Sequence, residues 1–178
     1  DELRLPSIFT DSMIRERNPS NPGWGWDKPG TEVTVSFGSQ EKKAVADEKG
    51  KWTVKLDPLP ANAAPAILRC KGTSSVEVSD VLVGEVWLCS GQSNMEWILK
   101  NCWDGDLESL ATKNANLPHI TVPNVGTQEM QEDFKGSWSV SAPESASNFS
   151  AVGYYYGSLL QKVLDVPVGL IANPWGGS

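Results

Sequence analysis

The 178-residue chain has a single histidine, His119, and only three cysteines, Cys70, Cys89 and Cys102. Three cysteines allow one disulfide at most, and no Cys-x-x-Cys pair or histidine cluster indicates a metal site. Cys89 lies in an apolar stretch, which is typical of a buried thiol.

The chain also lacks basic clusters and long apolar runs. Its formal net charge is −7, which argues against a nucleic-acid surface. Its apolar runs are strand-sized, so no membrane-spanning segment is expected. No signal peptide is visible at Asp1, although a mature exported protein would have lost one. There is no internal repeat and no low-complexity tract.

Residues 1–83 read as β structure, because apolar residues alternate in short runs separated by turn signals. The expected strands are Thr31–Phe37, Lys51–Leu56, Ala66–Cys70 and Val76–Val83. The expected turns are at Asn21–Gly23, Lys28–Gly30, Asp47–Gly50 and Asp57–Pro65. Short strands at this spacing predict a β-sandwich or jelly-roll-like unit as the first domain.

Residues 84–178 alternate strands and helices, which predicts a second domain with a parallel, doubly covered sheet. The expected strands are Glu85–Ser90, Ile120–Val122 and Val168–Ala172. The expected helices are a segment after Ser93, a weak one at Asp106–Lys113, and one containing Val152, Tyr155, Tyr156, Leu159, Leu160 and Val163, capped by Ser147 or Ser150.

The chain stops at Ser178, just after the third strand of this predicted sheet. Three parallel strands would leave an edge and apolar side chains uncovered. The sequence therefore predicts an incomplete α/β sheet, which more polypeptide completes along an open edge next to the strand ending at Ala172.

The segment Gly84–Trp97 carries the chemical signal. An apolar strand stops at Ser90-Gly91-Gln92-Ser93-Asn94, and a helix-compatible segment follows. A turn at the end of such a strand lies at the ligand-binding edge of α/β sheets. An exposed serine hydroxyl there, beside free N–H groups, suits nucleophilic acyl transfer. These are also ordinary turn residues, so an inert turn is the alternative.

Gly84–Trp97 resembles the first block of the SGNH hydrolases, in the branch typified by sialate O-acetylesterases, where Gly-Asp-Ser becomes Gly-Gln-Ser. The similarity extends over essentially the whole chain. Its other blocks are Leu5–Met13, Trp24–Trp26, Pro29–Val35, Gly50–Val54, Ser150–Tyr155, Val166–Ile171 and Trp175–Gly177. The resemblance implies that the second domain is the first part of an SGNH, flavodoxin-like, sheet.

This resemblance implies that Ser93 is the nucleophile and contributes to the oxyanion hole. Gly177, with Gly176 as the near alternative, would give a second backbone N–H. In the family an Asp-x-x-His supplies the base, and an asparagine completes the oxyanion hole. Both blocks are missing here. His119 is expected at the start of a strand, at the opposite end of the sheet from Ser93, and is not expected to be the base.

The nearby aspartates Asp80, Asp104 and Asp106 are not followed three residues later by histidine, so none forms the family's acid–base pair.

The remaining residues of the Gly84–Trp97 motif have two interpretations. Gln92, Asn94, Met95 and Trp97 either shape a pocket or pack the helix. Packing is the preferred interpretation for Met95 and Trp97.

The preferred function is a serine esterase that removes O-acetyl groups from sugars, sialic acids first, through an acyl-enzyme and without a cofactor. Its partners would be the acetylated carbohydrate and a carboxyl-terminal polypeptide supplying Asn and Asp-x-x-His. A second interpretation is an esterase for acetylated xylan or pectin. A third is a non-catalytic carbohydrate-binding module, with the eight tryptophans as sugar platforms rather than core. The resemblance implies an extracytoplasmic location: secreted, periplasmic, or lysosomal in a eukaryote.

Overall fold

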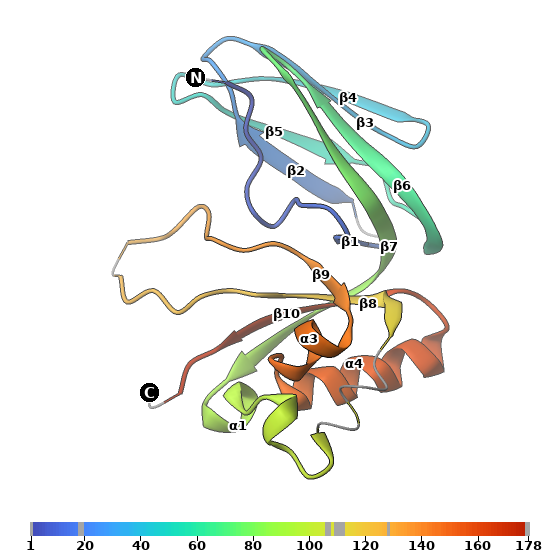
Figure 1. The fold of residues 1–178 in the computed structure, drawn as a ribbon. Coiled ribbons are helices and arrows are strands. Elements are labelled where there is room, and N and C mark those ends of the chain that lie inside the picture. Colours follow the sequence, from blue (N-terminus) through green and yellow to red (C-terminus); the bar gives the residue numbers. More distant parts are fainter. Residues whose placement is uncertain (1, 18–19, 106–107, 109–112, 128, 177–178) are drawn as a thin grey trace.

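The structure is a computed structural model that describes residues 2–17, 20–105, 108, 113–127 and 129–176. It is a mixed α/β fold with one eight-stranded sheet and one two-stranded sheet. Figure 1 shows a β unit formed by the first part of the chain above an α/β unit that carries the helices.

The β unit packs a two-stranded sheet on the antiparallel part of the large sheet. The small sheet pairs β2 (Asn21–Trp26) with β5 (Lys51–Leu56). The facing strands are β3 (Glu32–Phe37), β4 (Gln40–Val45) and β6 (Asn62–Lys71). Buried side chains from both sheets, including Val33, Val35, Trp52, Val54 and Leu56, form the core between them.

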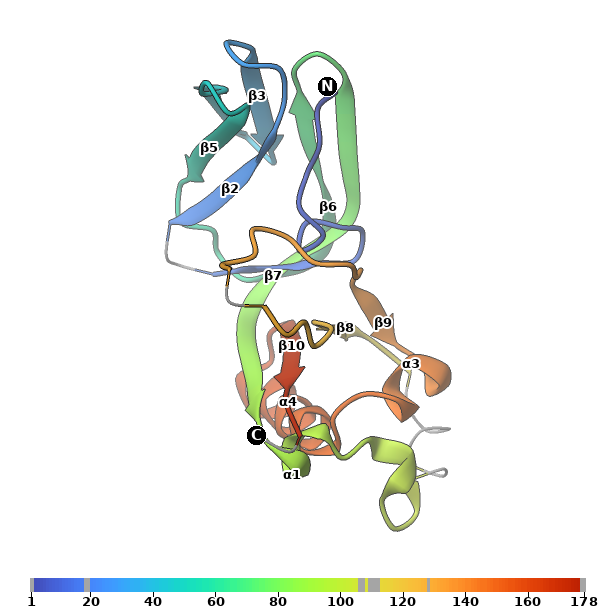
Figure 2. The same ribbon diagram turned by 90° about the vertical axis from the view of Figure 1, so that its left-hand side faces the viewer.

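β7 (Ser75–Gly91) is a single long strand that belongs to both units, as Figure 2 shows. Its first half pairs with β6, and Leu82–Gly84 also pairs with the short β1 (Ile14–Glu16). Its second half, Glu85–Gly91, pairs with β10 (Val168–Pro174). The sequence predicted two separate strands here, and the chain instead continues without a break through the predicted domain boundary at residues 83 and 84.

The parallel part of the sheet has the order β7–β10–β8, with β8 covering Asn114–Thr121. The short β9 (Ser139–Ser141) pairs antiparallel with β8. In a flavodoxin-like sheet the first strand would lie between the second and third, whereas here the third strand, β10, is central. β10 has partners on both sides, so the prediction of an open edge beside the strand ending at Ala172 is wrong.

Several short helical segments and one longer helix accompany these strands. They are α1 (Ser93–Glu96), the 3-10 helix η1 (Leu99–Asn101), α3 (Pro143–Ser147) and α4 (Ala151–Leu164). The Ser150 side chain caps α4 by accepting the Gly153 N–H at 3.3 Å, as one of the two predicted caps. The weak helix expected at Asp106–Lys113 falls mostly outside the described residues.

α4 packs on the parallel strands through its small residues. A Cβ on Gly157 would lie 2.7 Å from Leu170, and one on Gly153 would lie 3.0 Å from the Cys89 sulfur. These glycines therefore allow the helix to approach the sheet closely. Tyr154 is also buried against the sheet, whereas other large apolar residues of α4 face outward, with Leu159 59% and Val163 71% exposed.

Candidate active site

Ser93 lies immediately beyond the end of β7, as the sequence predicted. β7 ends at Gly91, Gln92 is the N-cap residue, and Ser93 is the first residue of α1. The Ser93 carbonyl accepts the Trp97 N–H at 3.0 Å, which closes the turn. The Ser93 side chain is exposed. Its backbone N–H is at the first helical position and has no acceptor within the helix. The hydroxyl and a donor are thus available at the same point.

The other parallel strands end beside this turn. β10 pairs Pro174 with Gly91, and the next residue, Trp175, donates its N–H to the Gly91 carbonyl at 2.8 Å. β8 ends at Thr121, which pairs with Ala172. A cavity of about 180 Å³ opens here, between α1, the end of β10 and the start of α4. Ligands bind at this edge of parallel sheets.

Of the two glycines expected near the oxyanion hole, the described residues include Gly176 and exclude Gly177. Gly176 lies against the side chain of Glu96, since a Cβ on residue 176 would meet the Glu96 carboxylate. Glu96 is on α1, three residues after Ser93, and lines the cavity of about 180 Å³. The Glu96 carboxylate therefore lies beside Gly176, the near alternative of the two expected glycines.

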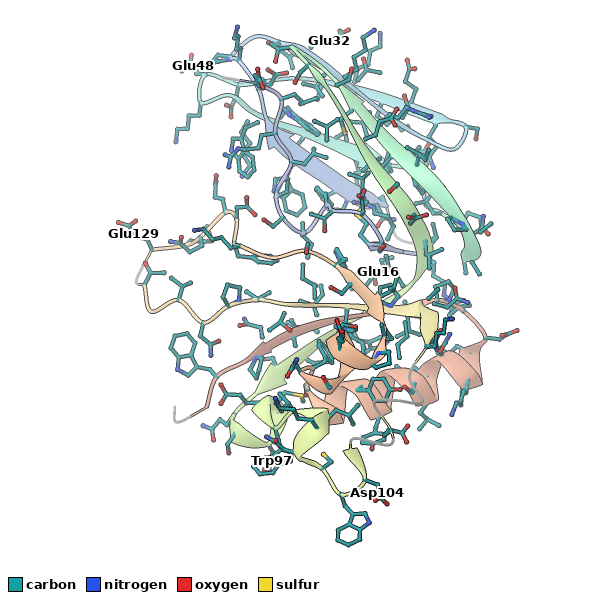
Figure 3. All side chains as sticks on the ribbon, in the orientation of Figure 1. Glu16, Glu32, Glu48, Trp97, Asp104 and Glu129 are labelled. Atoms are coloured by element: carbon teal, nitrogen blue, oxygen red, sulfur yellow. The ribbon has the colours of Figure 1, made fainter. Side chains whose placement is uncertain are left out.

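Met95 and Trp97 differ in their surroundings. Met95 packs against the core of the α/β unit, and its sulfur accepts the Ser150 hydroxyl at 3.3 Å. Trp97 is exposed, and Figure 3 places it with Asp104 at the end of the molecule opposite Glu32 and Glu48. Packing is therefore confirmed for Met95 and is wrong for Trp97.

His119 is a buried strand residue. It pairs with Leu170 near the end of β8, so the prediction that it begins a strand is wrong. Its ring lies 4.6 Å from that of Phe149, and its Nδ1 lies 3.4 Å from the Ser141 hydroxyl. Burial lowers the pKa of the imidazole below its usual 6.5. Both of these contacts are with core residues.

A larger cavity, of about 860 Å³, lies at the same edge and was not anticipated from the sequence. Its walls come from the amino-terminal segment, from residues 122, 123, 125, 131 and 133–135, and from the end of β10. The long connection from β8 to β9 was a signal that could have pointed to it, because long loops in compact units are commonly functional.

The described residues include no cluster of three or more His, Cys, Asp or Glu side chains placed to hold a metal ion. Within the same residues, no helix is both long and apolar enough to span a membrane. Cys89 is buried as predicted, and burial raises the pKa of its thiol. All three cysteines are free thiols.

The fold matches part of an esterase. It superposes on a carbohydrate acetylesterase from Xanthomonas citri with a TM-score of 0.95 and 36% identity, over 99% of this chain and 41% of that protein. No protein-family model matches the chain.

The predicted resemblance to sialate O-acetylesterases is confirmed. The chain is 30% identical to the sialate O-acetylesterase of Mus musculus and 29% identical to that of Homo sapiens, over 99% of its own length. It spans 36% and 38% of those proteins. Enzymes with these names, like the structural neighbour, are carboxylic-ester hydrolases.

Proposed function

We propose that this chain is the nucleophile-bearing part of a serine esterase that removes O-acetyl groups from carbohydrates. The observation that carries the proposal is the position of Ser93, exposed directly beyond β7 where β10 and β8 also end. The similarity to named carbohydrate esterases along 99% of the chain supports the same chemistry.

In the proposed reaction the Ser93 oxygen attacks the acetyl carbonyl while a histidine takes its proton. The tetrahedral oxyanion is held by the backbone N–H groups of Ser93 and Gly177, or its neighbour Gly176. Collapse returns the proton to the departing sugar oxygen and leaves an acetyl-enzyme, which water hydrolyses. No cofactor takes part.

The histidine, its aspartate and an oxyanion-hole asparagine come from further polypeptide of the same enzyme. His119 is held in the core between Phe149 and Ser141, so it is unsuited to this role. The relatives are more than twice as long as this chain, which leaves ample polypeptide for these residues. The proposed location is extracytoplasmic, following the resemblance alone.

The outward face of α4 is the surface on which we place this further polypeptide. Its exposed apolar residues are Val152, Tyr155, Tyr156, Leu159 and Val163, and Trp87 of β7 adjoins them through a ring contact with Tyr156 at 5.3 Å. An apolar stripe of this length on a helix normally faces a partner. The second half of β7 lies beside this face, and Leu88 on it is exposed. Among the described strands this half pairs with β10, so its other edge can accept a further strand.

Charge substitution on α4 tests that placement. Leu159→Glu should weaken the association of this chain with the separately produced carboxyl-terminal polypeptide by about tenfold or more. The substitution removes apolar area from the interface and buries a charge there. Val45→Glu, an exposed position on β4 of the β unit, is the matched control. Equal association of the two variants would contradict the placement.

Sialic acid esters are the first candidate substrates, because the curated relatives are sialate O-acetylesterases. The structural neighbour, at 36% identity, is a carbohydrate acetylesterase whose name does not single out sialic acid, so acetylated xylan or pectin stays the second candidate. A purely carbohydrate-binding function is less well supported, because it leaves the exposed Ser93 turn without a purpose.

The nucleophile is tested by Ser93→Ala in the full-length enzyme. Acetyl release should fall by roughly 10⁴-fold or more, as in other serine hydrolases that lose the nucleophile. Ser75→Ala, at the exposed far end of the same strand, should leave it unchanged. Labelling with a fluorophosphonate, followed by peptide mass mapping, should place the adduct on Ser93. Normal turnover by Ser93→Ala would refute the assignment.

A further inference from the structure

The 860 Å³ cavity is built by three segments that are distant in sequence. Arg4 and Ser7 come from the amino-terminal segment, Val122 and Phe134 from the connection between β8 and β9, and Trp175 from the end of β10. Figure 1 shows that connection running between the β unit and β10. The volume lies within the range of small-molecule sites.

This cavity adjoins the Ser93 turn through β10. Asn173 and Trp175 both line it, and β10 pairs Asn173 with Ser90. The backbone N–H of Trp175 is bonded to Gly91, two residues before Ser93. A molecule in the cavity therefore contacts the residues that are fastened to the nucleophile's turn.

The walls are held in place before any ligand binds. The Asp133 carboxylate accepts the N–H groups of Ser7 at 2.7 Å and of Phe134 at 2.9 Å, and Arg4 lies 4.0 Å from it. Arg4 in turn stacks on Trp26 at 4.2 Å. These contacts join the β8–β9 connection to the β unit, and a pre-formed site loses less conformational freedom on binding.

The lining has the chemistry that a sugar ring needs. A pyranose presents C–H groups on its faces and hydroxyls around its rim. The Trp175 indole, 43% exposed, and the Phe134 ring provide apolar surfaces. Gln131, Asn173 and Lys135 provide amide and ammonium groups for the rim.

We propose that this cavity binds the pyranose rings of the glycan that carries the acetyl ester, with Trp175 as the stacking platform. The proposal rests on the proposed esterase function for its substrate class. It gives the β unit a part in substrate binding, because Arg4 and Ser7 fix one wall. The shared chemistry is the pyranose ring, whether of an acidic sialoglycan or of a neutral plant-wall glycan.

The test compares kcat/KM for an acetylated glycan with kcat/KM for phenyl acetate, a small ester without a sugar, in the full-length enzyme. Trp175→Ala should lower the glycan-to-phenyl-acetate ratio by about tenfold, since it removes binding energy specific to the sugar. Trp175→Phe should restore much of the ratio. Trp103→Ala is the matched control, because Trp103 is 92% exposed and does not line the cavity.

Two glycan arms identify the source of the ring. Lys135→Gln should lower kcat/KM for an O-acetylated sialoglycan, whose carboxylate Lys135 would meet, by a larger factor than for an acetylated xylo-oligosaccharide, because glutamine still donates to a hydroxyl but carries no charge. A Trp175→Ala ratio that stays at the wild-type value for both glycans would overturn the proposal. So would an equal loss on glycan and phenyl acetate, because Trp175 would then act on the turn rather than on the sugar.

Direct binding separates this proposal from the esterase assignment. Saturation-transfer NMR with the deacetylated glycans needs no turnover, so it remains informative if Ser93→Ala retains activity. Binding by Ser93→Ala that is lost in the Ser93→Ala, Trp175→Ala double variant is the expected result. Equal saturation transfer in both variants would refute the cavity assignment, whatever the nucleophile.

Discussion

Replacing Gly84 with alanine should disturb the point where β7 passes from the β unit to the α/β unit. A Cβ on residue 84 would lie 2.7 Å from the carbonyl carbon of Pro167 and closer still to its oxygen. That oxygen accepts the Glu85 N–H at 2.9 Å, the contact that precedes the β7–β10 ladder. The clash falls on backbone, which cannot rotate aside as a side-chain tip can.

The expected cost follows from three effects. Overpacking costs about 1–3 kcal/mol, and weakening the Glu85–Pro167 hydrogen bond costs about 1 kcal/mol. Alanine regains about 0.4–1 kcal/mol by restricting the unfolded chain. The net loss is about 2 kcal/mol, or roughly 4–8 °C in melting temperature for a chain of this size.

Thermal unfolding followed by circular dichroism measures this loss. Gly126→Ala is the control, because a Cβ on residue 126 would meet no atom within 4 Å. Its melting temperature should stay at the wild-type value or rise slightly. If Gly84→Ala melted at the same temperature as Gly126→Ala, the close approach of β7 to Pro167 would be refuted.

Three further predictions concern buried titratable groups. His119→Gln in the full-length enzyme should keep most esterase activity, and a loss matching that of Ser93→Ala would make His119 the base. Burial lowers the His119 pKa below 6.5, so the unfolded chain binds a proton more readily than the folded chain does. The melting temperature should therefore fall as pH drops below about 6.5, and should fall less steeply in His119→Gln. An equal pH dependence of the melting temperature in the two proteins would contradict this. Burial raises the pKa of the Cys89 thiol, so iodoacetamide should label Cys89 slowly in the folded chain and rapidly in denaturant, as peptide mapping would measure.

Local sequence patterns predicted several elements well. β5 has the predicted bounds Lys51–Leu56, because its alternating residues face one core. α4 begins after the predicted cap Ser150. Asn21–Gly23 was expected to turn and instead opens β2. Pro22 is tolerated there because β5 is the strand that β2 pairs with among the described residues, and the bridge from Arg4 on the other edge is at Trp26.

Tertiary pairing explains the other differences. β8 begins at Asn114 although Pro118 interrupts the strand pattern. Its ladder with β9 shifts register between Asn114 and His119, so no regular bond is needed at Pro118. This longer strand moved His119 from a strand start to a strand end. The Ser93 turn was predictable from a local motif, whereas the large cavity joins segments that only the fold brings together.

The division into domains 1–83 and 84–178 stays a prediction. Packing and hydrogen bonds across the boundary join the two parts. Ile120 and Trp138, from the second part, are buried in the core of the β unit. The Trp138 indole donates to the Ile8 carbonyl at 2.8 Å, and its backbone N–H donates to the Thr10 hydroxyl at 3.0 Å. β7 carries the chain through both units without a break. The β unit therefore fixes the strand that ends at the Ser93 turn and one wall of the cavity beside it, so the proposed site depends on both units.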